Sequence, residues 1–274
     1  HVHSLANPLY AYKASADPDT LYHHQAMKEP DHAAFSDAMQ LEYSNRLDEK
    51  TYSIIHKSKV PEGATILPTV WQLRRKRDIK TRKVKKYKAR LNLDGSRMIH
   101  GKHYDQSYAP VASWNSIRTL LTLTAINGWH TRQLDYVAAF PQAPIERELY
   151  MRIPPGINAG IKGNPKDYAL KLHRNIYGQK QAGRVWNKYL VRKLIKEVGF
   201  TQSKVDNCVF YHGKTMYVLY TDDSILAGPD LDEIDKIIAK MRRAQLDITI
   251  EGDLEDFLGG NIDRKKDGTI HLTQ

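Results

Sequence analysis

Two adjacent acidic residues stand at the centre of an apolar segment, Lys214–Gly228, with the sequence KTMYVLYTDDSILAG. Strand-prone runs at Met216–Tyr220 and Ser224–Ala227 flank Asp222 and Asp223, which predicts two buried strands with the carboxylates at a hairpin tip. Asp is also common in ordinary polar turns. A tight hairpin, however, usually takes Asn-Gly or Asp-Gly, and two like charges placed together cost free energy unless a cation neutralises them. The segment therefore favours a metal site over a plain turn.

A third carboxylate, Asp135, lies at the end of another expected strand, Trp129–Asp135, just before a turn marked by two prolines. A single Asp at a strand end is usually only solvated. Together with Asp222 and Asp223, it supplies oxygen ligands from two strands, the kind of set that paired Mg²⁺ ions require for phosphoryl transfer. We therefore predict that these three residues are catalytic and bind two Mg²⁺ ions, with Mn²⁺ as a substitute.

Composition restricts the class of protein. The chain has 274 residues, of which 41% are hydrophobic, so it can form one large domain or two subdomains. It lacks an apolar run of about 20 residues, which predicts no membrane span. Its one cysteine, Cys208, excludes an internal disulfide, and we interpret it as a small buried hydrophobic residue. The first residue is His1 rather than Met, so we expect a piece of a longer polyprotein.

The balance of charge points to an anionic partner. The net charge is +11 and the isoelectric point is near 9.5, which favours nucleic acid first. The densest basic run is Arg74–Arg90, RRKRDIKTRKVKKYKAR. A solvated charge run and a nuclear-localisation-like patch are the alternatives. Interspersed apolar residues instead suggest twisted strands with cations on one face. We predict nucleic-acid contacts for four residues of this run: Lys76, Arg77, Lys85 and Lys86.

Several helices and a further hairpin are expected around these segments. Pro30-Asp31 is expected to cap a helix with an apolar stripe at Phe35, Met39, Leu41, Tyr43 and Leu47. Amphipathic helices are expected at Ser116–Ile126 and Leu231–Gln245. An Asp267-Gly268 turn is expected to join Phe257–Arg264 to Thr269–Gln274.

The sequence Tyr220-Thr221-Asp222-Asp223 resembles the Tyr-x-Asp-Asp box of reverse transcriptases. From about Glu29 to Gln274, the chain resembles the polymerase of Copia-type (Pseudoviridae) LTR retrotransposons, because eight blocks occur in that family's order. The blocks are AFSDAMQLEYSNRLDEKTY, YKARL, YDQSYAPVASWNSIRTLLTLTA, QLDYVAAFPQAPIERELYMRIPPG, KLHRNIYGQKQAGRVWNKYL, GFTQSKVDNCVF, LYTDDSILAG and DLEDFLGGNIDRKKDGTIHLTQ.

The resemblance implies an α+β fold shaped like the reverse-transcriptase right hand. It would have an antiparallel palm sheet backed by helices and β-rich fingers, with the thumb absent. Residues 1–25 are then an N-terminal lead-in or linker, and residues 26–274 form the fingers and palm, without the thumb and ribonuclease H.

The resemblance also implies a dNTP site. Lys88 and Arg90, which share a strand face at period two, would hold the triphosphate. Phe140, five residues after Asp135, would discriminate the sugar, with ordinary core packing as its alternative. Tyr177, Gly178 and Gln181 match the block that contacts the template and the nucleotide base. The sequence departs from the family pattern at three places: Asn92–Asp94, Gln179 and Gly183.

The implied function is an RNA-directed DNA polymerase that adds dNTPs to a primer 3′-hydroxyl. Its partners would be an RNA or DNA template with primer, dNTPs and the rest of the Pol polyprotein, with integrase upstream and ribonuclease H downstream. No membrane is expected; the location would be cytoplasmic, in a virus-like particle, with a nuclear stage as the second option. A decayed or domesticated fragment that only binds nucleic acid is one alternative, motivated by the three departures. A two-metal nuclease would use the same carboxylates but leaves the basic run and Phe140 unexplained.

Overall fold

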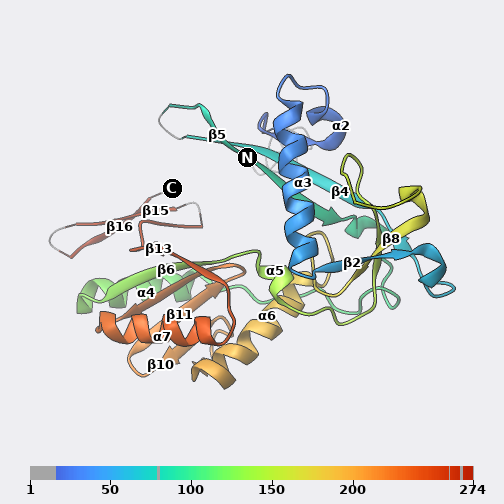
Figure 1. The fold of residues 1–274 in the computed structure, drawn as a ribbon. Coiled ribbons are helices and arrows are strands. Elements are labelled where there is room, and N and C mark those ends of the chain that lie inside the picture. Colours follow the sequence, from blue (N-terminus) through green and yellow to red (C-terminus); the bar gives the residue numbers. More distant parts are fainter. Residues whose placement is uncertain (1–16, 79–80, 259, 266–267, 274) are drawn as a thin grey trace, which may run out of the picture. The chain divides into compact units, whose positions relative to one another are not determined.

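The computed structural model describes residues 17–78, 81–258, 260–265 and 268–273 (Figure 1). The chain forms two compact units. Unit 1 comprises the residues through Asp105 together with Ile145–Lys180, and unit 2 comprises Gln106–Pro144 together with Gln181–Gln274. Each unit is therefore built from two separate stretches of the sequence.

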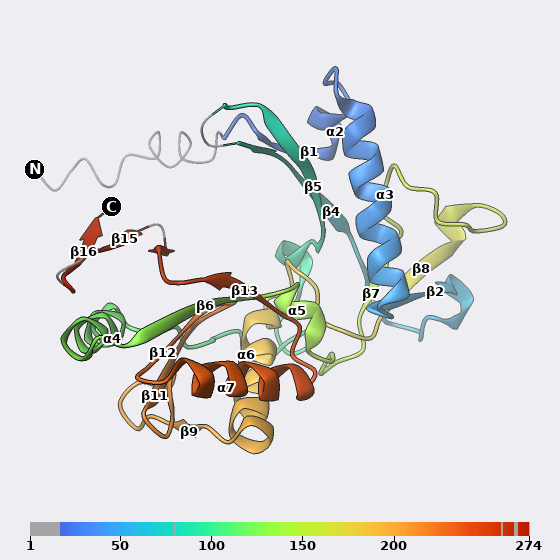
Figure 2. The same cartoon turned by 60° about the vertical axis from the view of Figure 1, so that its left-hand side comes forward.

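A long antiparallel ribbon dominates unit 1 (Figure 2). It contains β1 (Thr20–Tyr22), β4 (Thr69–Arg77) and β5 (Val84–Leu93), in the order β1-β4-β5. Helix α3 (His32–Asp48) packs against β5. The core of unit 1 combines side chains of α3 with those of the ribbon: Phe35, Met39, Tyr43, Trp71, Leu73 and Leu91. Most of the predicted stripe on this helix is confirmed, but Leu41 is 60% exposed.

Strand β1 and the short helix α2 (His23–Ala26) lie at the end of the stretch 1–25 that the sequence predicts to be a lead-in or linker. Both begin within residues 1–25, yet β1 pairs with β4 and Ala26 is completely buried. The folded part therefore includes Thr20–Ala26. The strand is held by backbone pairing with β4, which requires no particular side-chain pattern in the sequence. Residues 1–16 lie outside the described part of the chain.

A second sheet completes unit 1. Its order is β2 (Tyr52–His56), β8 (Tyr168–Leu172), β7 (Tyr150–Arg152) and β3 (Ile66–Leu67), and only the β3–β7 pair is parallel. Among its described residues, single turns of 3₁₀ helix lie in the connections: η2 (Lys57–Lys59), η3 (Gly95–Arg97) and η4 (Pro165–Asp167).

Unit 2 is built on a six-stranded sheet in which all neighbouring strands are antiparallel. The order is β13 (Ile248–Gly252), β6 (His130–Tyr136), β12 (Asp223–Gly228), β11 (Thr215–Tyr220), β10 (Val209–His212) and β9 (Thr201–Gln202). Its helices are α4 (Trp114–Asn127), α5 (Ala139–Gln142), α6 (Ala182–Lys193) with the π-helical turn η5 (Leu194–Val198), and α7 (Leu231–Arg243). Helix α4 contacts β11 and β12, whereas α7 contacts β12 and β6.

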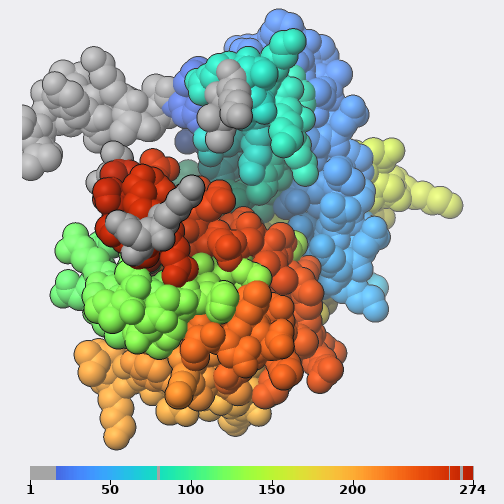
Figure 3. Space-filling view, turned by 90° about the vertical axis from the view of Figure 1, so that its left-hand side faces the viewer, coloured from blue at the N-terminus to red at the C-terminus, as the bar shows by residue number. Residues whose placement is uncertain are grey.

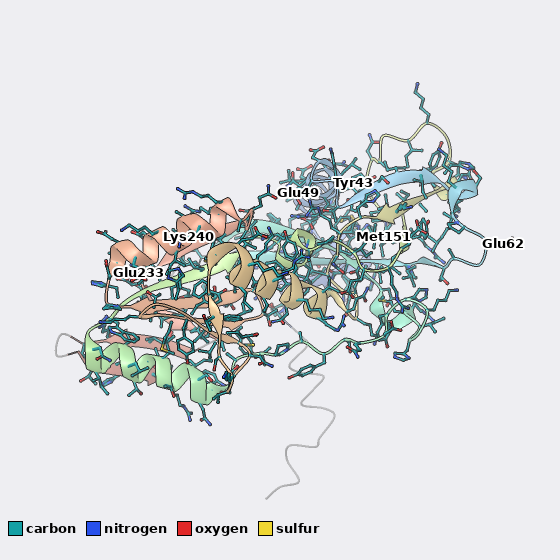
Figure 4. The ribbon with its side chains drawn as sticks, turned by 90° about the horizontal axis from the view of Figure 1, so that it is seen from below. Tyr43, Glu49, Glu62, Met151, Glu233 and Lys240 are labelled. Atoms are coloured by element: carbon teal, nitrogen blue, oxygen red, sulfur yellow. The ribbon has the colours of Figure 1, made fainter. Side chains whose placement is uncertain are left out.

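Strand β12 is covered on both of its faces. Residues Ser224–Gly228 are buried in succession, although alternate side chains of a strand point to opposite faces. In Figure 4 the strands lie between α7, which carries Glu233 and Lys240, and α4. The core of unit 2 therefore extends to both sides of the strand that begins with Asp223.

The helix predictions for this unit are confirmed. Helix α4 begins after Ser113, whose side chain accepts a hydrogen bond from the Ser116 amide, and it ends at Gly128, which has a left-handed φ of 62°. Helix α7 begins after Asp230, which caps two amides of the first turn. Its buried stripe contains Ile234, Ile237, Ile238 and Met241.

The last described strands form a small sheet, β14 (Asp256–Phe257), β15 (Gly260–Arg264) and β16 (Ile270–Thr273). The expected hairpin pairing of β15 with β16 is confirmed, while Asp267 of its predicted turn lies outside the described residues. Strand β16 contacts α4, and Figure 3 shows this end of the chain, in red, over the green α4–β6 segment.

Cys208 is completely buried in the core of unit 2, and burial raises the pKa of its thiol to about 12, as expected for a small hydrophobic residue. Among the helices that the structure describes, we find none with the length and apolar character needed to cross a bilayer.

Candidate functional site

The β11–β12 hairpin carries the paired acids of the sequence. Tyr220 and Asp223 pair across the two strands, which leaves Thr221 and Asp222 as a two-residue loop. Asp222 thus occupies the tip, as predicted, whereas Asp223 is already the first residue of β12. A two-residue loop fixes the register of both strands, and so it fixes the face on which Asp223 lies.

Asp135 of β6 lies directly opposite Asp223 of β12 in the sheet register. Directly paired residues of antiparallel strands share a face, with their Cβ atoms about 4.5–5.5 Å apart. The adjacent residues Leu134, Tyr136 and Ser224 therefore point to the other face. The structure brings together the three carboxylates that the sequence predicted, from two strands that are far apart in the chain.

Several carboxylates lie close enough on this face to repel one another. The pKa of Asp223 is raised to about 6, first by burial and then by the negative charges of Asp222, Asp135, Glu251 and Asp256. Glu251 lies on β13 and Asp256 on β14. Sequence reasoning missed both. Glu251 comes near Asp223 only because β13 pairs beside β6, and Asp256 follows on β14 of a separate sheet.

The carboxylates fit a divalent metal ion by their chemistry. Within the described ranges, no three His, Cys, Asp or Glu side chains are gathered tightly enough to enclose an ion as they stand. The available donors are nevertheless hard carboxylate oxygens, which suit Mg²⁺. A divalent cation would also offset the repulsion that, after burial, raises the pKa of Asp223.

The backbone of the hairpin loop has an unusual conformation. Thr221 has a φ of 58°, which is uncommon for a β-branched residue. A positive φ at the first loop position is typical of type II′ turns, where Gly is usual. Two outside donors contact this loop: the Trp186 indole N–H donates to the Thr221 carbonyl oxygen at 2.8 Å, and the Tyr136 amide donates to the Asp222 carbonyl oxygen at 3.1 Å.

A second unusual loop follows Asp135. Ala138 has a φ of 47° immediately before α5. The Gln142 amide holds the loop, since its Nε2 donates to the carbonyl oxygens of Val137 and Asp247 at 2.8 and 2.9 Å, and its Oε1 accepts from the Asp247 amide at 3.0 Å. Phe140 of α5 is partly buried against the core of unit 2. This position is compatible with either role predicted for Phe140.

In unit 1, the ribbon collects cations on one face. The register pairs Arg74 with Lys88, Lys76 with Lys86, and Gln72 with Arg90. These cations, Arg74, Lys76, Lys86, Lys88 and Arg90, are here called the cationic face. The prediction that Lys88 and Arg90 share a strand face is thereby confirmed. Like charges directly opposite each other destabilise a sheet, so this face favours an anionic partner.

The four predicted nucleic-acid contacts do not form one patch. Lys76 and Lys86 belong to the cationic face, but Arg77 alternates away from Lys76 on β4. Its guanidinium donates to both carboxylate oxygens of Asp19, at distances from 2.7 to 3.0 Å, and this contact lowers the pKa of Asp19. Lys85 is the extra residue of a β-bulge, because Lys76 pairs with Lys86 and Arg77 with Val84.

The end of β5 contacts the segment that contains Tyr177 and Gly178. The Arg90 guanidinium lies 5.1 Å from the Tyr177 ring centre, a cation–π contact. The Leu93 amide donates to the Tyr177 carbonyl oxygen at 2.9 Å. The structure therefore brings together three residues predicted for the dNTP site.

Gly95 and Gly178 allow the backbone at the end of β5 to approach the backbone of the Tyr177–Gly178 segment closely. A Cβ added to Gly178 would lie 2.0 Å from the Leu93 carbonyl oxygen, and one added to Gly95 would lie 2.1 Å from the Gly178 carbonyl oxygen. Gly178 also has a φ of 86°. The departure at Asn92–Asp94 is thus part of a closely packed junction of two backbones.

Gln181, the last predicted dNTP contact, belongs to unit 2, where it precedes α6. Its side chain is 3% exposed, and that of Gln179 is 6% exposed. Within the described part of the chain, neither amide group has a hydrogen-bond partner. Buried amides normally bind water, protein or ligand, so both positions have free hydrogen-bonding capacity.

Comparison with known proteins defines the class. The family model described as "Reverse transcriptase (RNA-dependent DNA polymerase)" matches residues 49–274, and the chain belongs to this family. The predicted resemblance to Copia-type retrotransposon Pol polyproteins is confirmed.

Two curated relatives match over nearly the whole chain. The retrovirus-related Pol polyprotein from transposon TNT 1-94 of Nicotiana tabacum is 29% identical over 91% of this chain. That from transposon RE2 of Arabidopsis thaliana is 30% identical over 98% of this chain. The chain spans 18% of the length of each of these relatives.

Among solved structures, a foamy viral protease–reverse transcriptase in complex with double-stranded DNA matches at 13% identity and a TM-score of 0.45. The match covers 86% of this chain and 35% of that chain.

Proposed function

We propose that this chain is the fingers and palm of an RNA-directed DNA polymerase, which adds dNTPs to a primer 3′-hydroxyl by two-metal phosphoryl transfer. The observation that carries the proposal is the register of Asp135 opposite Asp223, with Asp222 at the adjoining hairpin tip. In a family of reverse transcriptases, this is the acidic set that two-metal chemistry requires.

Unit 2 is the palm in this proposal. Asp135, Asp222 and Asp223 hold two Mg²⁺ ions, which when bound supply Lewis acidity toward the 3′-hydroxyl and the α-phosphate. The pKa of Asp223 is raised first by burial and then by repulsion from the neighbouring carboxylates, and a bound cation would offset that repulsion. Phe140 stands against the sugar and excludes the 2′-hydroxyl of a ribonucleotide.

Unit 1 is the fingers. Arg90 makes bidentate contacts to the triphosphate and Lys88 contributes a point charge. The remaining cationic face binds the phosphates of the RNA or DNA template and primer. Tyr177 and Gly178, held at the end of β5, contact the incoming nucleotide together with Gln181.

The partners follow from this function. They are a template with primer, dNTPs, and the rest of a Pol polyprotein with integrase upstream and ribonuclease H downstream. The site of action is a cytoplasmic virus-like particle, with a nuclear stage as the second option.

Primer extension on a homopolymer RNA template tests the proposal directly. The chain is supplied with a labelled primer, the complementary dNTP and Mg²⁺ or Mn²⁺, and the Asp222→Asn variant serves as the matched control. If the unmodified chain extends the primer and the Asp222→Asn variant does not, the result supports the polymerase.

The second candidate function is a decayed polymerase that only binds nucleic acid. It is favoured by Gln179, a departure from the family pattern whose buried amide has no hydrogen-bond partner among the described residues. A decayed polymerase would bind template–primer without extending it in either metal. Shortening of the labelled strand without dNTPs would instead identify a nuclease.

A further inference from the structure

We propose that Trp186 is a positioning residue for the acidic hairpin: its indole N–H sets the direction of Asp222, and with it the affinity of the site for divalent metal ions. This inference rests on the proposed metal-binding role of the hairpin. It concerns an uncharged residue of α6 that would act on the metal ions only through the backbone of the loop.

The contact is made to the peptide group that leads into Asp222. Trp186 is 1% exposed, and its Nε1 donates to the Thr221 carbonyl oxygen at 2.8 Å. This carbonyl belongs to the planar peptide unit that joins Thr221 to Asp222. Fixing the oxygen therefore fixes the plane from which the Asp222 side chain departs.

The same ring also contacts the strand that carries Asp135. The Trp186 and Tyr136 rings meet edge to face, with their centres 5.0 Å apart and their planes at 70°. The Tyr136 amide in turn donates to the Asp222 carbonyl oxygen at 3.1 Å. A hydrogen bond of 2.7 Å between the hydroxyls of Tyr136 and Tyr217 ties Tyr136 to β11. Trp186 is thus in contact with both segments that bear the metal ligands.

The loop needs such support because its backbone is strained. Thr221 has a φ of 58°, and such a conformation persists only where the surroundings hold it. Without the indole donor, the Thr221 carbonyl would lose this hydrogen bond. The loop backbone, including the peptide between Thr221 and Asp222, would then be free to rearrange toward a turn with a negative φ at Thr221. Rotation of that peptide would move the Asp222 carboxylate away from Asp135 and Asp223.

A matched control for this test exists in unit 1. Trp71 is also 1% exposed, and its Nε1 also donates one hydrogen bond to a backbone carbonyl, that of Pro155, at 2.9 Å. Replacing either tryptophan by its benzothiophene analogue keeps ring and volume but removes the N–H donor. Trp186→Phe and Trp71→Phe provide the same comparison with natural residues, at the cost of a cavity in each core.

The measurement is Mn²⁺ binding to the full chain, followed by electron paramagnetic resonance, so that it does not depend on turnover. We expect the Trp186 analogue to weaken Mn²⁺ binding by about 10- to 100-fold, the usual effect of losing a group that orients a metal ligand. The Trp71 analogue should bind Mn²⁺ like the unmodified chain. Melting temperatures of the two analogues should fall to a similar extent.

A double substitution separates positioning from simple packing. Thr221→Gly removes the strain, because Gly adopts a positive φ readily. In that background, the Trp186 analogue should lose less Mn²⁺ affinity than it does beside Thr221. A loss of equal size in both backgrounds would overturn the role of the strained turn.

The outcomes also separate this inference from the proposed function. Equal Mn²⁺ affinity in the Trp186 and Trp71 analogues overturns the inference, even if the unmodified chain extends primers. If the unmodified chain binds Mn²⁺ but does not extend primers, the polymerase proposal fails while a Trp186-specific loss of Mn²⁺ affinity still supports positioning. A chain that binds no Mn²⁺ overturns both.

Discussion

The β4–β5 ribbon of unit 1 and the β11–β12 hairpin of unit 2 both place like charges together, but they do so in opposite surroundings. On the ribbon, cations pair across the strands along an open face, Arg74 with Lys88 and Lys76 with Lys86. On the hairpin, Asp222 and Asp223 stand at the end of strands that are buried on both sides. The ribbon thus spreads its charge along a face on which Arg74, Lys76 and Lys86 are exposed, with Arg74 also 3.3 Å from Asp17, whereas the hairpin concentrates its charge against a core.

The difference predicts how strongly each region should respond to the loss of a single charged side chain. Charges in water are screened, and the removal of one weakens binding to a polyanion by a modest, additive amount. The proposed metal site at the hairpin has few carboxylates, and burial and repulsion already raise the pKa of Asp223 to about 6. Removing one of its ligands, or turning it slightly, should therefore have a much larger effect.

The largest effect is expected at the acidic hairpin. Asp222→Asn or Asp135→Asn should reduce nucleotide addition to background while the melting temperature is kept, because the ligand charge is lost but its volume stays. Asp223→Asn should also be severe. Glu251→Gln, at an exposed position of β13, is the matched control and should retain most activity. Extension by Asp135→Asn at the unmodified rate would contradict the assignment.

The next effect concerns Phe140, the partly buried ring on the loop after Asp135. If the ring stands against the sugar, Phe140→Val should raise ribonucleotide incorporation about tenfold or more, a loss of at least ~1.4 kcal/mol of discrimination. Incorporation of dNTPs should change little.

The competing role of Phe140 has its own readout. A purely structural ring would lower stability by roughly 1–3 kcal/mol on truncation and leave the sugar selectivity unaltered. The dNTP/rNTP ratio and the melting temperature of one purified variant distinguish the two roles.

A smaller and graded effect is expected on the ribbon. Replacing Lys76 and Lys86 together by Gln should flatten the salt dependence of template–primer affinity, by about 0.7 to 0.9 in the log–log slope for each phosphate that is no longer neutralised. Replacing Arg77 and Lys85 by Gln is the matched control. Its slope should change less, because Arg77 is paired with Asp19 and Lys85 lies in the bulge. Equal slopes for the two pairs would mean that the cationic face is only a solvated surface.

The smallest effect is expected on the inner face of the ribbon, where Arg75 makes a bidentate contact to Asp31 at 2.7 Å and Tyr87 donates to the same carboxylate at 2.8 Å. The Arg75 contact is the main reason that the pKa of Asp31 is lowered to about 2. Asp31→Asn should cost about 1 kcal/mol of unfolding free energy at neutral pH, since water partly screens the pair.

The sign of the pH dependence follows from the lowered pKa. The stabilisation by Asp31 is complete above its ordinary pKa of 3.8 and is lost as the pH falls through about 2. The urea-unfolding free energies of the unmodified chain and of Asp31→Asn should therefore differ at pH 7 and converge as the pH falls below about 2. A difference that persists there would show that packing, not the ion pair, stabilises this junction.

Much of this contrast could be predicted from the sequence. The apolar runs around Asp222 and Asp223 predict the hairpin, and the period-two spacing of Lys88 and Arg90 predicts their common face. The stripes of α4 and α7 follow from the helical period. These features are local, so neighbouring residues are enough to determine them.

What could not be predicted depends on pairing between distant segments. Thr20–Tyr22 is short, and only its pairing with β4 makes it a strand. Lys85 enters a bulge because of the register with Arg77. Glu251 approaches Asp223 only through the sheet order, and the Trp186 hydrogen bond joins residues 35 positions apart. No local pattern marks any of these interactions.

The close junction of Gly95 and Gly178 has a consequence for how related genes diverge. Any base change in the first or second codon position of either glycine adds a Cβ or ends the chain, and the added atom would lie about 2 Å from a backbone oxygen. A gene copy that drifts without selection should therefore lose the fold of unit 1 once either codon changes at one of these positions. In a set of duplicated copies, the loss of either glycine should mark a copy that no longer encodes a folded unit 1.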